Sequence, residues 1–190
     1  MSHSTFTRRR VMRDGALSIA ALAATLARPA EANLPAASAS DVSIENFGPD
    51  GKSLGLTRVP KIHKTDAEWK AQLKPDSFEV TRKAGTERAF TGPLLNQHGD
   101  GIFKCICCET AVYDSHTKFE SGTGWPSFYQ PISKHNIVES ADHSYGMERT
   151  AVSCARCDAH LGHVFNDGPR PTGLRYCMNS VAMTFAPKKS

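Results

Sequence analysis

The sequence predicts a mainly β fold in which a short helical lead-in packs on two antiparallel sheets and a four-cysteine zinc site staples the domain. Three observations support this class. Short segments of extended-type composition alternate with Gly and Pro breaks from residue 101 onward. A helix signal precedes them in residues 65–83. Two Cys-x-x-Cys pairs, with 45 residues between them, supply a complete set of zinc ligands.

The composition fits one globular domain without a nucleic-acid-binding face. The hydrophobic fraction is 39% and the aromatic fraction 8%, enough for a single core. Five of the 23 basic and two of the 19 acidic residues lie in residues 1–32, so the remainder carries a net charge of only +1. A nucleic-acid-binding domain would keep a basic face. We therefore predict no nucleic-acid partner.

Residues 1–32 are predicted to be a signal peptide rather than part of the fold. Residues 7–13 (TRRRVMR) resemble a twin-arginine export motif, and 16–27 form a short apolar stretch of about 18 Å as a helix. Small residues at 30 and 32, or at 37 and 39, offer cleavage sites. These features predict a periplasmic protein exported folded by the twin-arginine translocase. The alternatives are a basic tail on a cytosolic protein and an uncleaved anchor.

The next segments predict a linker and then two short helices. Residues 33–60 are predicted to be a linker and extended arm, because 33–40 are uncharged Ala, Ser and Pro and 41–60 show little periodicity. Thr65 and Glu68 form a capping-box pattern, followed by Trp69 and Leu73 and ended by Pro75. A second helix is predicted over about 76–83.

Extended-type composition predicts strands at 102–104, 111–113, 137–140, 150–153, 175–179 and 181–185. Gly and Pro residues separate them. The chain contains no Gly-rich phosphate loop, no dinucleotide fingerprint and no G-x-S-x-G element. Nucleotide-dependent and acyl-transfer chemistry are therefore not indicated.

Four cysteines have the spacing of a structural zinc site. Cys105 with Cys108 and Cys154 with Cys157 are two knuckles that together fill a tetrahedral shell. Such a zinc, one per chain, would have no open position for water and would be structural. Cys107 has a spacing that would let it replace Cys105 or Cys108. The alternative is a set of disulfides, as an exported protein can carry.

Cys177 is separate from both knuckles and lies in a predicted strand, 175–179 (RYCMN). Alternation along a strand puts Arg175, Cys177 and Asn179 on one face. A neighbouring guanidinium favours the thiolate, which is the reactive form of cysteine. The alternative is a buried structural cysteine.

Several long segments resemble the methionine-R-sulfoxide reductases. Residues 118–128 (KFESGTGWPSF), 159–169 (AHLGHVFNDGP) and 174–180 (LRYCMNS) look like the three signature segments of that family, and 86–92 fits its lead-in. The two knuckles fall where zinc-containing members carry them. The resemblance covers roughly residues 60–187. It implies a catalytic domain at 61–187 with an antiparallel β fold, a shallow pocket and reduction of the R epimer of methionine sulfoxide.

The resemblance also implies roles for individual residues. Cys177 would attack the sulfoxide sulfur, and histidine is well suited to protonate the departing oxygen near neutral pH. We expect His163 to transfer that proton, His160 to help bind the oxygen, and Asn179 to orient the site. Substrate-binding residues would be Trp125, Arg175 and Phe165. The alternatives are structural histidines near the zinc and a Trp125 that only packs the core.

One departure from the family pattern concerns recycling of the enzyme. Attack would leave Cys177 as a sulfenic acid, which a second thiol normally converts to a disulfide for a thioredoxin-like reductant. Many members carry that resolving cysteine where this chain has Thr123. Cys107 is the remaining spare thiol, and we hypothesise that it resolves the sulfenic acid. The alternative is direct attack on Cys177 by an external reductant.

The predicted partners are therefore oxidised proteins containing methionine sulfoxide and a thioredoxin-like reductant. Two other functions compete with this prediction. A non-enzymatic zinc-binding interaction module would use the thiols only for metal. A thiol oxidoreductase working through a Cys-x-x-Cys pair would lose activity with Cys105 or Cys108 but not with Cys177.

Overall fold

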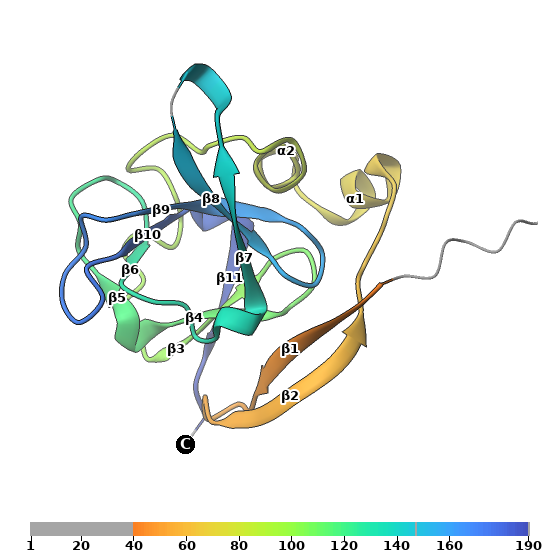
Figure 1. Ribbon diagram of the computed structural model, residues 1–190, viewed down its shortest axis with the longest axis horizontal. Helices are drawn as coiled ribbons and strands as arrows, with labels where there is room; N and C mark the ends of the chain where they lie inside the picture. The colour runs from red at the N-terminus through yellow and green to blue at the C-terminus, as the bar shows by residue number, and fades with distance from the viewer. Residues whose placement is uncertain (1–39, 147, 190) are drawn as a thin grey trace, which may run out of the picture. The chain divides into compact units, whose positions relative to one another are not determined.

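The computed structural model describes residues 40–146 and 148–189. Its elements in chain order are β1 (Asp41–Phe47), β2 (Ser53–Pro60), α1 (Asp66–Gln72), α2 (Pro75–Lys83), β3 (Gly101–Cys105), β4 (Ala111–Asp114), β5 (Lys118–Phe119), β6 (Ser127–Phe128), β7 (Ile137–Asp142), β8 (Arg149–Cys154), β9 (His160–Phe165), β10 (Arg175–Met178) and β11 (Met183–Pro187). Short 3-10 turns connect several of them, including η2 (Lys134–Asn136) and η4 (Ser180–Ala182). The predicted mainly β class is confirmed (Figure 1).

The described strands form three antiparallel sheets. The largest has the order β5-β6-β10-β9-β8-β7, and a three-stranded sheet has the order β11-β3-β4. These two correspond to the predicted pair of sheets. The third is a hairpin of β1 and β2 (Figure 1).

The predicted extended arm is a β-hairpin over its described part. Its strands pair from Asp41 opposite Pro60 to Phe47 opposite Ser53. The side chain of Asn136 in η2 holds the hairpin to the domain, since it accepts from the Glu45 amide at 2.7 Å and donates to the Glu45 carbonyl at 2.8 Å. The predicted signal peptide and the linker up to residue 39 lie outside the described residues.

Both predicted helices are present and their ends follow from local chemistry. Thr65 and Glu68 cap α1 reciprocally, as the sequence predicted, and Trp69 is the residue that this helix buries. Pro75 occupies the first turn of α2, where its missing amide proton costs nothing. Ala84 ends α2 in the left-handed conformation, with φ of 53°. Among the described residues no helix is long and apolar enough to cross a bilayer.

Aromatic rings in the core join the two larger sheets. Phe103 of β3 meets Phe128 of β6 edge to face at 4.9 Å between ring centroids, and Tyr113 of β4 stacks on Phe128 at 4.4 Å. Tyr176 of β10 lies 5.9 Å from Tyr113. All four rings are buried. Since such pairs add about 0.5–1.5 kcal/mol each beyond the burial of their area, this cluster fixes β10, and with it Cys177, relative to the rest of the domain.

The sequence patterns did not predict β9 or the two-residue strands β5 and β6. In β9, His160, Gly162 and His163 dilute the β-branched residues that mark a strand. Two-residue strands carry no periodicity at all. The last predicted strand starts later than expected, because residues 180–182 form η4 before β11 begins.

Candidate active site

Cys177 and His163 face each other across two neighbouring strands. In the antiparallel pairing of β10 with β9, Cys177 is the register partner of His163. Side chains directly opposite in such a pair point to the same face with Cβ atoms about 5 Å apart. The fold therefore places a thiol beside an imidazole, although 13 residues lie between them in the chain.

A small pocket of about 130 Å³ opens over this pair. The predicted residues Trp125, Phe165 and Asn179 line it together with Cys177 and His163. Thr86, Arg149 and Gly162 also line the pocket and were not predicted. The site therefore combines an apolar wall with one thiol and one imidazole.

Gly162 lets β9 and β10 approach closely below the pocket. A Cβ atom at this position would lie 2.1 Å from the carbonyl oxygen of Cys177. Since no side chain tolerates that distance, the strand carrying His163 reaches the strand carrying Cys177 only because residue 162 is glycine.

The environment of Cys177 differs from what the sequence suggested. Burial raises the pKa of the Cys177 thiol, and the hydroxyl of Thr123 and then the guanidinium of Arg175 act in the opposite direction. Arg175 thus favours the thiolate as expected, but desolvation outweighs it. Cys177 therefore rests mainly as a thiol at neutral pH.

Asp142 orients His163 and was not predicted. Its carboxylate lies 2.7 Å from Nε2 of His163 and 2.8 Å from a guanidinium nitrogen of Arg149. Hydrogen bonds from Ser144, followed by that from His163, lower the pKa of the Asp142 carboxyl. An ionised carboxylate on Nε2 requires the ring to carry a proton there. Nδ1 is then the ring nitrogen that Asp142 does not hold.

His160 does not line the pocket over Cys177. Its ring lies 5.2 Å from that of His163, but it borders a different cavity, shared with Thr81 and Asp158. The side chain is buried and Nε2 has no hydrogen-bond partner among the described residues. Burial, with a further contribution from His163, lowers the pKa of His160 to about 4. The imidazole is therefore neutral in the folded protein near pH 7.

This burial predicts a loss of stability in mild acid. The unfolded chain takes up a proton at residue 160 below about pH 6.5, whereas the folded chain does so only near pH 4. The stability that the neutral, buried imidazole contributes is therefore complete above pH 6.5. It is lost as the pH falls from 6.5 toward 4, and the free energy of unfolding is lower by about 1 kcal/mol at pH 5.5. Urea unfolding at pH 7.5 and 5.5 with saturating zinc should show a smaller acid loss in His160→Asn than in the wild type. Equal losses would contradict the prediction.

Arg175 lies beside the pocket rather than in its lining. Its guanidinium donates two hydrogen bonds to Asp167, at 2.9 and 2.7 Å, and stacks on the Phe165 ring at 4.4 Å. Arg175 thereby holds a wall residue in place. Its predicted contact with substrate stays a prediction.

Asn179 and Glu87 tie the segment before the sheets to the pocket. Asn179 accepts from the Glu87 amide at 2.9 Å and donates to the Leu161 carbonyl at 3.0 Å. The Glu87 carboxylate accepts from the amides of Ser180 and Val181 at 2.7 and 2.9 Å, and its carbonyl accepts from Trp125 Nε1 at 3.1 Å. Glu87 was not predicted, although it fixes both Trp125 and η4.

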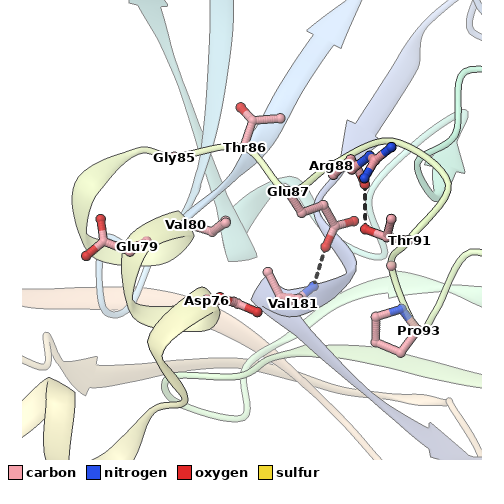
Figure 2. A pocket seen from close by; sticks show the side chains of 11 residues that line it. Asp76, Glu79, Val80, Gly85, Thr86, Glu87, Arg88, Thr91, Pro93 and Val181 are labelled. Atoms are coloured by element: carbon pink, nitrogen blue, oxygen red, sulfur yellow. Dashed lines mark hydrogen bonds between the residues drawn. The ribbon is translucent and has the colours of Figure 1, made fainter.

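A larger cavity of about 580 Å³ borders the Glu87 segment (Figure 2). Asp76 and Glu79 of α2 line it together with Thr91 and Pro93, and the hydrogen bond from the Val181 amide to the Glu87 carboxylate lies along its edge. Thr86 lines both this cavity and the pocket over Cys177. The two hollows are therefore neighbours separated by one backbone segment.

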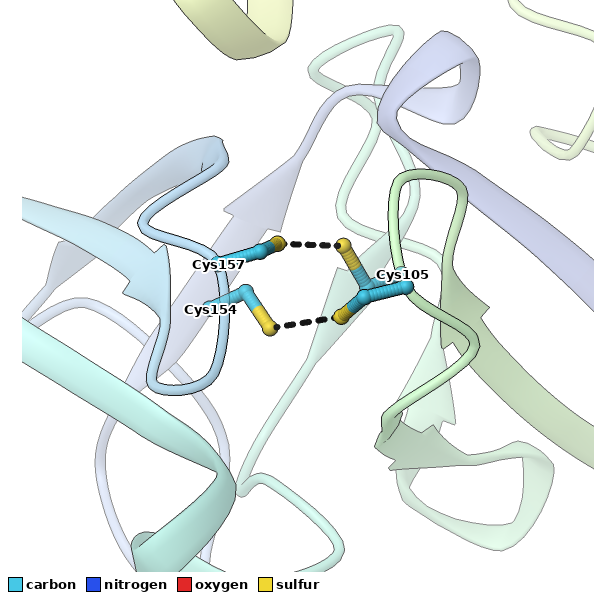
Figure 3. Close-up of side chains that lie close together, drawn as sticks. Cys105, Cys154 and Cys157 are labelled. Atoms are coloured by element: carbon cyan, nitrogen blue, oxygen red, sulfur yellow. Dashed lines mark hydrogen bonds between the residues drawn. The ribbon is translucent and has the colours of Figure 1, made fainter. Parts of the chain in front are cut away.

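Cys105, Cys108, Cys154 and Cys157 form one cluster, with every sulfur within 4.8 Å of the others. Cys105 lies 3.6 Å from Cys157 and Cys108 lies 3.5 Å from Cys154 (Figure 3). Four sulfurs bound to a tetrahedral zinc at about 2.3 Å stand roughly 3.8 Å apart. The cluster therefore fits a zinc ion, and these four cysteines would hold it.

The two knuckles share one backbone shape. The amide of Glu109 donates to the Cys105 carbonyl at 2.9 Å, and the amide of Asp158 donates to the Cys154 carbonyl at 2.9 Å. Glu109 and Asp158 both have positive φ, 61° and 56°. Such paired turns from β3 and β8 point their sulfurs at one centre, so the cluster joins the two larger sheets.

Cys107 lies in the first knuckle but outside the four-sulfur cluster. It is buried, and its pKa is lowered by contacts with Cys105 and Cys157. The Cys107 carbonyl accepts from Gln72 of α1 at 2.9 Å. No contact in the described part of the chain connects Cys107 with Cys177.

A second group of potential metal ligands, Asp100, Asp114 and His116, already encloses a cation of the chain itself. The ammonium of Lys188 lies 2.9 Å from Asp100 and 3.0 Å from Asp114. These ion pairs fasten the end of the chain to β4.

A pocket thiol opposite an imidazole, carried on sheets joined by a four-cysteine cluster, is the type of arrangement that supports thiol chemistry in enzymes. The model of the SelR domain family matches residues 73–187. A peptide methionine sulfoxide reductase MsrB of Pseudomonas putida (strain W619) is 56% identical over 130 residues, covering 68% of this chain and 98% of that protein.

Two further relatives give the same result. The MsrB of Pseudomonas entomophila (strain L48) is 55% identical over 130 residues, covering 68% of this chain and 99% of that protein. That of Pseudomonas fluorescens (strain Pf0-1) is 55% identical over 131 residues, covering 69% of this chain and all of that protein. The chain belongs to the MsrB family of peptide methionine sulfoxide reductases.

Proposed function

We propose that this chain repairs oxidised proteins by reducing the R epimer of methionine sulfoxide at Cys177. The observation that carries this proposal is the cross-strand pair of Cys177 and His163 under an apolar wall. Membership of the MsrB family supports the enzyme over a non-enzymatic zinc module. Both Cys-x-x-Cys pairs belong to the four-sulfur cluster, which disfavours a redox role for them.

In the proposed reaction the Cys177 thiolate attacks the sulfoxide sulfur and takes over its oxygen. Nδ1 of His163 takes the Cys177 thiol proton before the attack and passes the same proton to that oxygen, while Asp142 accepts from the protonated Nε2. The products are a Cys177 sulfenic acid and methionine, so the cysteine sulfur is oxidised by two electrons and the substrate sulfur is reduced by two. A dithiol then reduces the sulfenic acid, which yields the Cys177 thiol, the disulfide of the reductant and one water molecule, and His163 ends the cycle in its starting state.

Two aromatic rings of the pocket are suited to bind the S-methyl group of methionine sulfoxide. Trp125 is fixed by its bond to the Glu87 carbonyl, and Phe165 by the stacked guanidinium of Arg175. A methyl group between two held rings loses water at little cost in ordering. We propose that these rings receive the S-methyl group while Asn179 keeps the Glu87 segment in place.

The role of Asp142 leads to a prediction for Asp142→Asn. An asparagine amide can donate as well as accept, so it no longer fixes the proton on Nε2 of His163, and kcat should fall about tenfold or more with little change in KM. Steady-state kinetics on a methionine-R-sulfoxide peptide would measure this. Asp66→Asn, which removes an exposed pairing with Lys83 on the helices, is the matched control and should leave kcat unchanged. An unchanged kcat in Asp142→Asn would remove this residue from the mechanism.

For recycling, we propose that a thioredoxin-like dithiol attacks the Cys177 sulfenic acid directly. Cys107 is buried in the knuckle and Thr123 occupies the position beside Cys177, so a disulfide to Cys107 would require movement of the chain. Non-reducing mass spectrometry after one turnover distinguishes the routes. A Cys107–Cys177 linkage would establish Cys107 as the resolving residue and contradict direct reduction.

We further propose that the cluster binds one structural zinc ion per chain and that residues 1–32 direct twin-arginine export to the periplasm. Four thiolates leave no coordination site for substrate, so the ion would stabilise the scaffold and take no part in the reaction. Export of a folded chain suits a domain whose metal is bound during folding. Fractionation of cells with and without the twin-arginine translocase would test whether the chain reaches the periplasm by this route.

The experiment that tests the function is turnover of the two separated sulfoxide epimers. The zinc-loaded enzyme with a dithiol reductant should reduce the R epimer and leave the S epimer. Zinc content is measured on the same sample. Equal rates on both epimers, or no turnover of either, would overturn the proposal.

A further inference from the structure

Three hydroxyl groups form a continuous line that ends at the Cys177 sulfur. Thr123 Oγ1 lies 3.8 Å from Cys177 Sγ, within hydrogen-bonding range for sulfur. Behind it, Ser121 Oγ lies 2.8 Å from Thr123 Oγ1 and 2.7 Å from Ser127 Oγ. Ser127 Oγ lies 3.2 Å from the Trp125 carbonyl. The line therefore starts at the thiol and ends at a buried hydroxyl, Ser127, which lies opposite Cys177 in the sheet and also helps to lower the pKa of the thiol.

The backbone of this loop is shaped to present Thr123 to the sulfur. Gly122 and Gly124 on either side have φ of 71° and 92°, which side chains rarely adopt. A Cβ atom at Gly124 would also lie 2.8 Å from Phe90. The far end of the line is fixed as well, because Ser127 is fully buried and pairs in β6 with Cys177 of β10.

The line can run in two directions because each hydroxyl has one proton to donate. With a neutral thiol, Cys177 donates to Thr123, Thr123 to Ser121, Ser121 to Ser127, and Ser127 to the Trp125 carbonyl. With a thiolate the order reverses, and Ser127 donates to Ser121, Ser121 to Thr123, and Thr123 to the sulfur. In both states the sulfur keeps a partner, and no proton has to enter or leave the hydroxyl line itself.

We propose that Thr123, backed by Ser121 and Ser127, is a positioning residue that turns its hydroxyl toward Cys177 when the thiol ionises and so stabilises the attacking thiolate. Hydrogen bonds to an ionised group are about twice as strong as neutral ones. Reversal of the line therefore favours the thiolate over the thiol. The hydroxyl offsets part of the desolvation that Cys177 experiences.

Charged side chains approach Cys177 from the strands, whereas the loop that carries Thr123 offers only hydroxyl groups to stabilise the thiolate. His163 of β9, Arg175 of β10, Arg149 of β8 and Asp142 of β7 surround the pocket, and Asp167 neutralises Arg175. The loop of residues 121–127 carries no ionisable side chain. Among the separate causes that lower the pKa of Cys177, the hydrogen bond to the Thr123 hydroxyl is the largest, ahead of the charge of Arg175.

The test is the pH profile of Cys177 alkylation in the reduced, zinc-loaded enzyme. Iodoacetamide reacts with the thiolate, and peptide mass spectrometry follows Cys177 alone from pH 6 to 10. In Thr123→Val, which keeps the shape but lacks the hydroxyl, the rate at pH 7 should fall between about threefold and tenfold, with an unchanged limit at high pH. Thr123→Ser restores the hydroxyl and should stay within about twofold of the wild type.

A Thr123→Val profile that overlays the wild type would overturn the proposal, and so would an equal shift in Thr123→Ser. If Thr123→Val loses zinc or folds poorly, Ser121→Ala decides. It leaves Thr123 in place but removes the donor behind it, so its profile should shift in the same direction by a smaller factor. An unshifted Ser121→Ala profile then overturns the proposal.

The inference rests on Cys177 as the nucleophile of the proposed function, but its readout needs no sulfoxide. A shifted alkylation profile without epimer turnover would reject the function and keep the hydroxyl line. Normal epimer turnover with an unshifted alkylation profile would keep the proposed function and reject the role of the hydroxyl line.

Discussion

Cys177→Ser is expected to lower the rate of methionine-R-sulfoxide reduction by about a thousandfold or more. Serine has a hydroxyl of much higher pKa in place of the thiol. It cannot take up the sulfoxide oxygen, whereas the cysteine sulfur does so and becomes a sulfenic acid. The change removes little volume from a half-buried position in β10, so the melting temperature and the zinc content should stay near those of the wild type. Turnover of the R epimer with excess dithiol measures the effect.

Cys107→Ser is the matched control for that experiment. It exchanges the same atoms at a cysteine outside the four-sulfur cluster, and under direct reduction it should keep turnover within about twofold. A Cys177→Ser enzyme that retained a tenth of the wild-type rate would show that the sulfur of β10 is not the nucleophile.

The second large effect is expected from loss of the cluster. Cys154→Ser, or removal of zinc with a chelator, should abolish cooperative unfolding and leave a chain without near-ultraviolet circular dichroism. Structural zinc sites contribute about 10–16 kcal/mol, which matches or exceeds the 5–15 kcal/mol by which domains are stable. Cys154 is fully buried between β8 and the knuckle of β3, so the loss disconnects the two larger sheets.

Thermal unfolding followed by circular dichroism, with zinc measured on each sample, would check this effect. Cys107→Ser again serves as the control, since it alters the same knuckle without removing a cluster sulfur. A Cys154→Ser protein that unfolds cooperatively at the wild-type temperature would contradict a stabilising metal site.

Local signals made the helices and the cluster predictable from the sequence. The capping box of Thr65 and Glu68 satisfies amides within one turn, so its geometry depends on four residues alone. The knuckle spacing likewise predicted the cluster, and the structure adds that Cys108 rather than Cys107 completes the first pair. The hairpin of β1 and β2 lacked such a signal, because β2 is exposed on both faces and shows no alternation.

The pocket was predictable in its residue types but not in its geometry. Cys177, His163 and Trp125 were predicted from a resemblance to a family, and strand register then placed the first two together. Asp142 and Glu87 were missed because each acts on a partner more than 20 residues away in the chain. Such contacts arise only from the folded sheet order, which single-sequence patterns do not contain.

The balance of effects at Cys177 was also beyond the sequence. Arg175 two residues away suggested a thiol that ionises readily. In the structure, however, Arg175 is paired with Asp167, and burial in the pocket removes water from the sulfur. Only the depth of the pocket decides which effect is larger.

If Cys177 carries out the chemistry while the four cluster cysteines hold a metal, a single turnover without reductant should modify Cys177 and leave the cluster intact. The reduced, zinc-loaded enzyme is mixed with excess methionine-R-sulfoxide and dimedone, without reductant, and the peptides are then mapped by mass spectrometry. The account predicts one methionine per chain, a dimedone adduct on Cys177, and zinc retained. An adduct on Cys105, Cys108, Cys154 or Cys157, or methionine formed with Cys177 unmodified and unlinked, would contradict it.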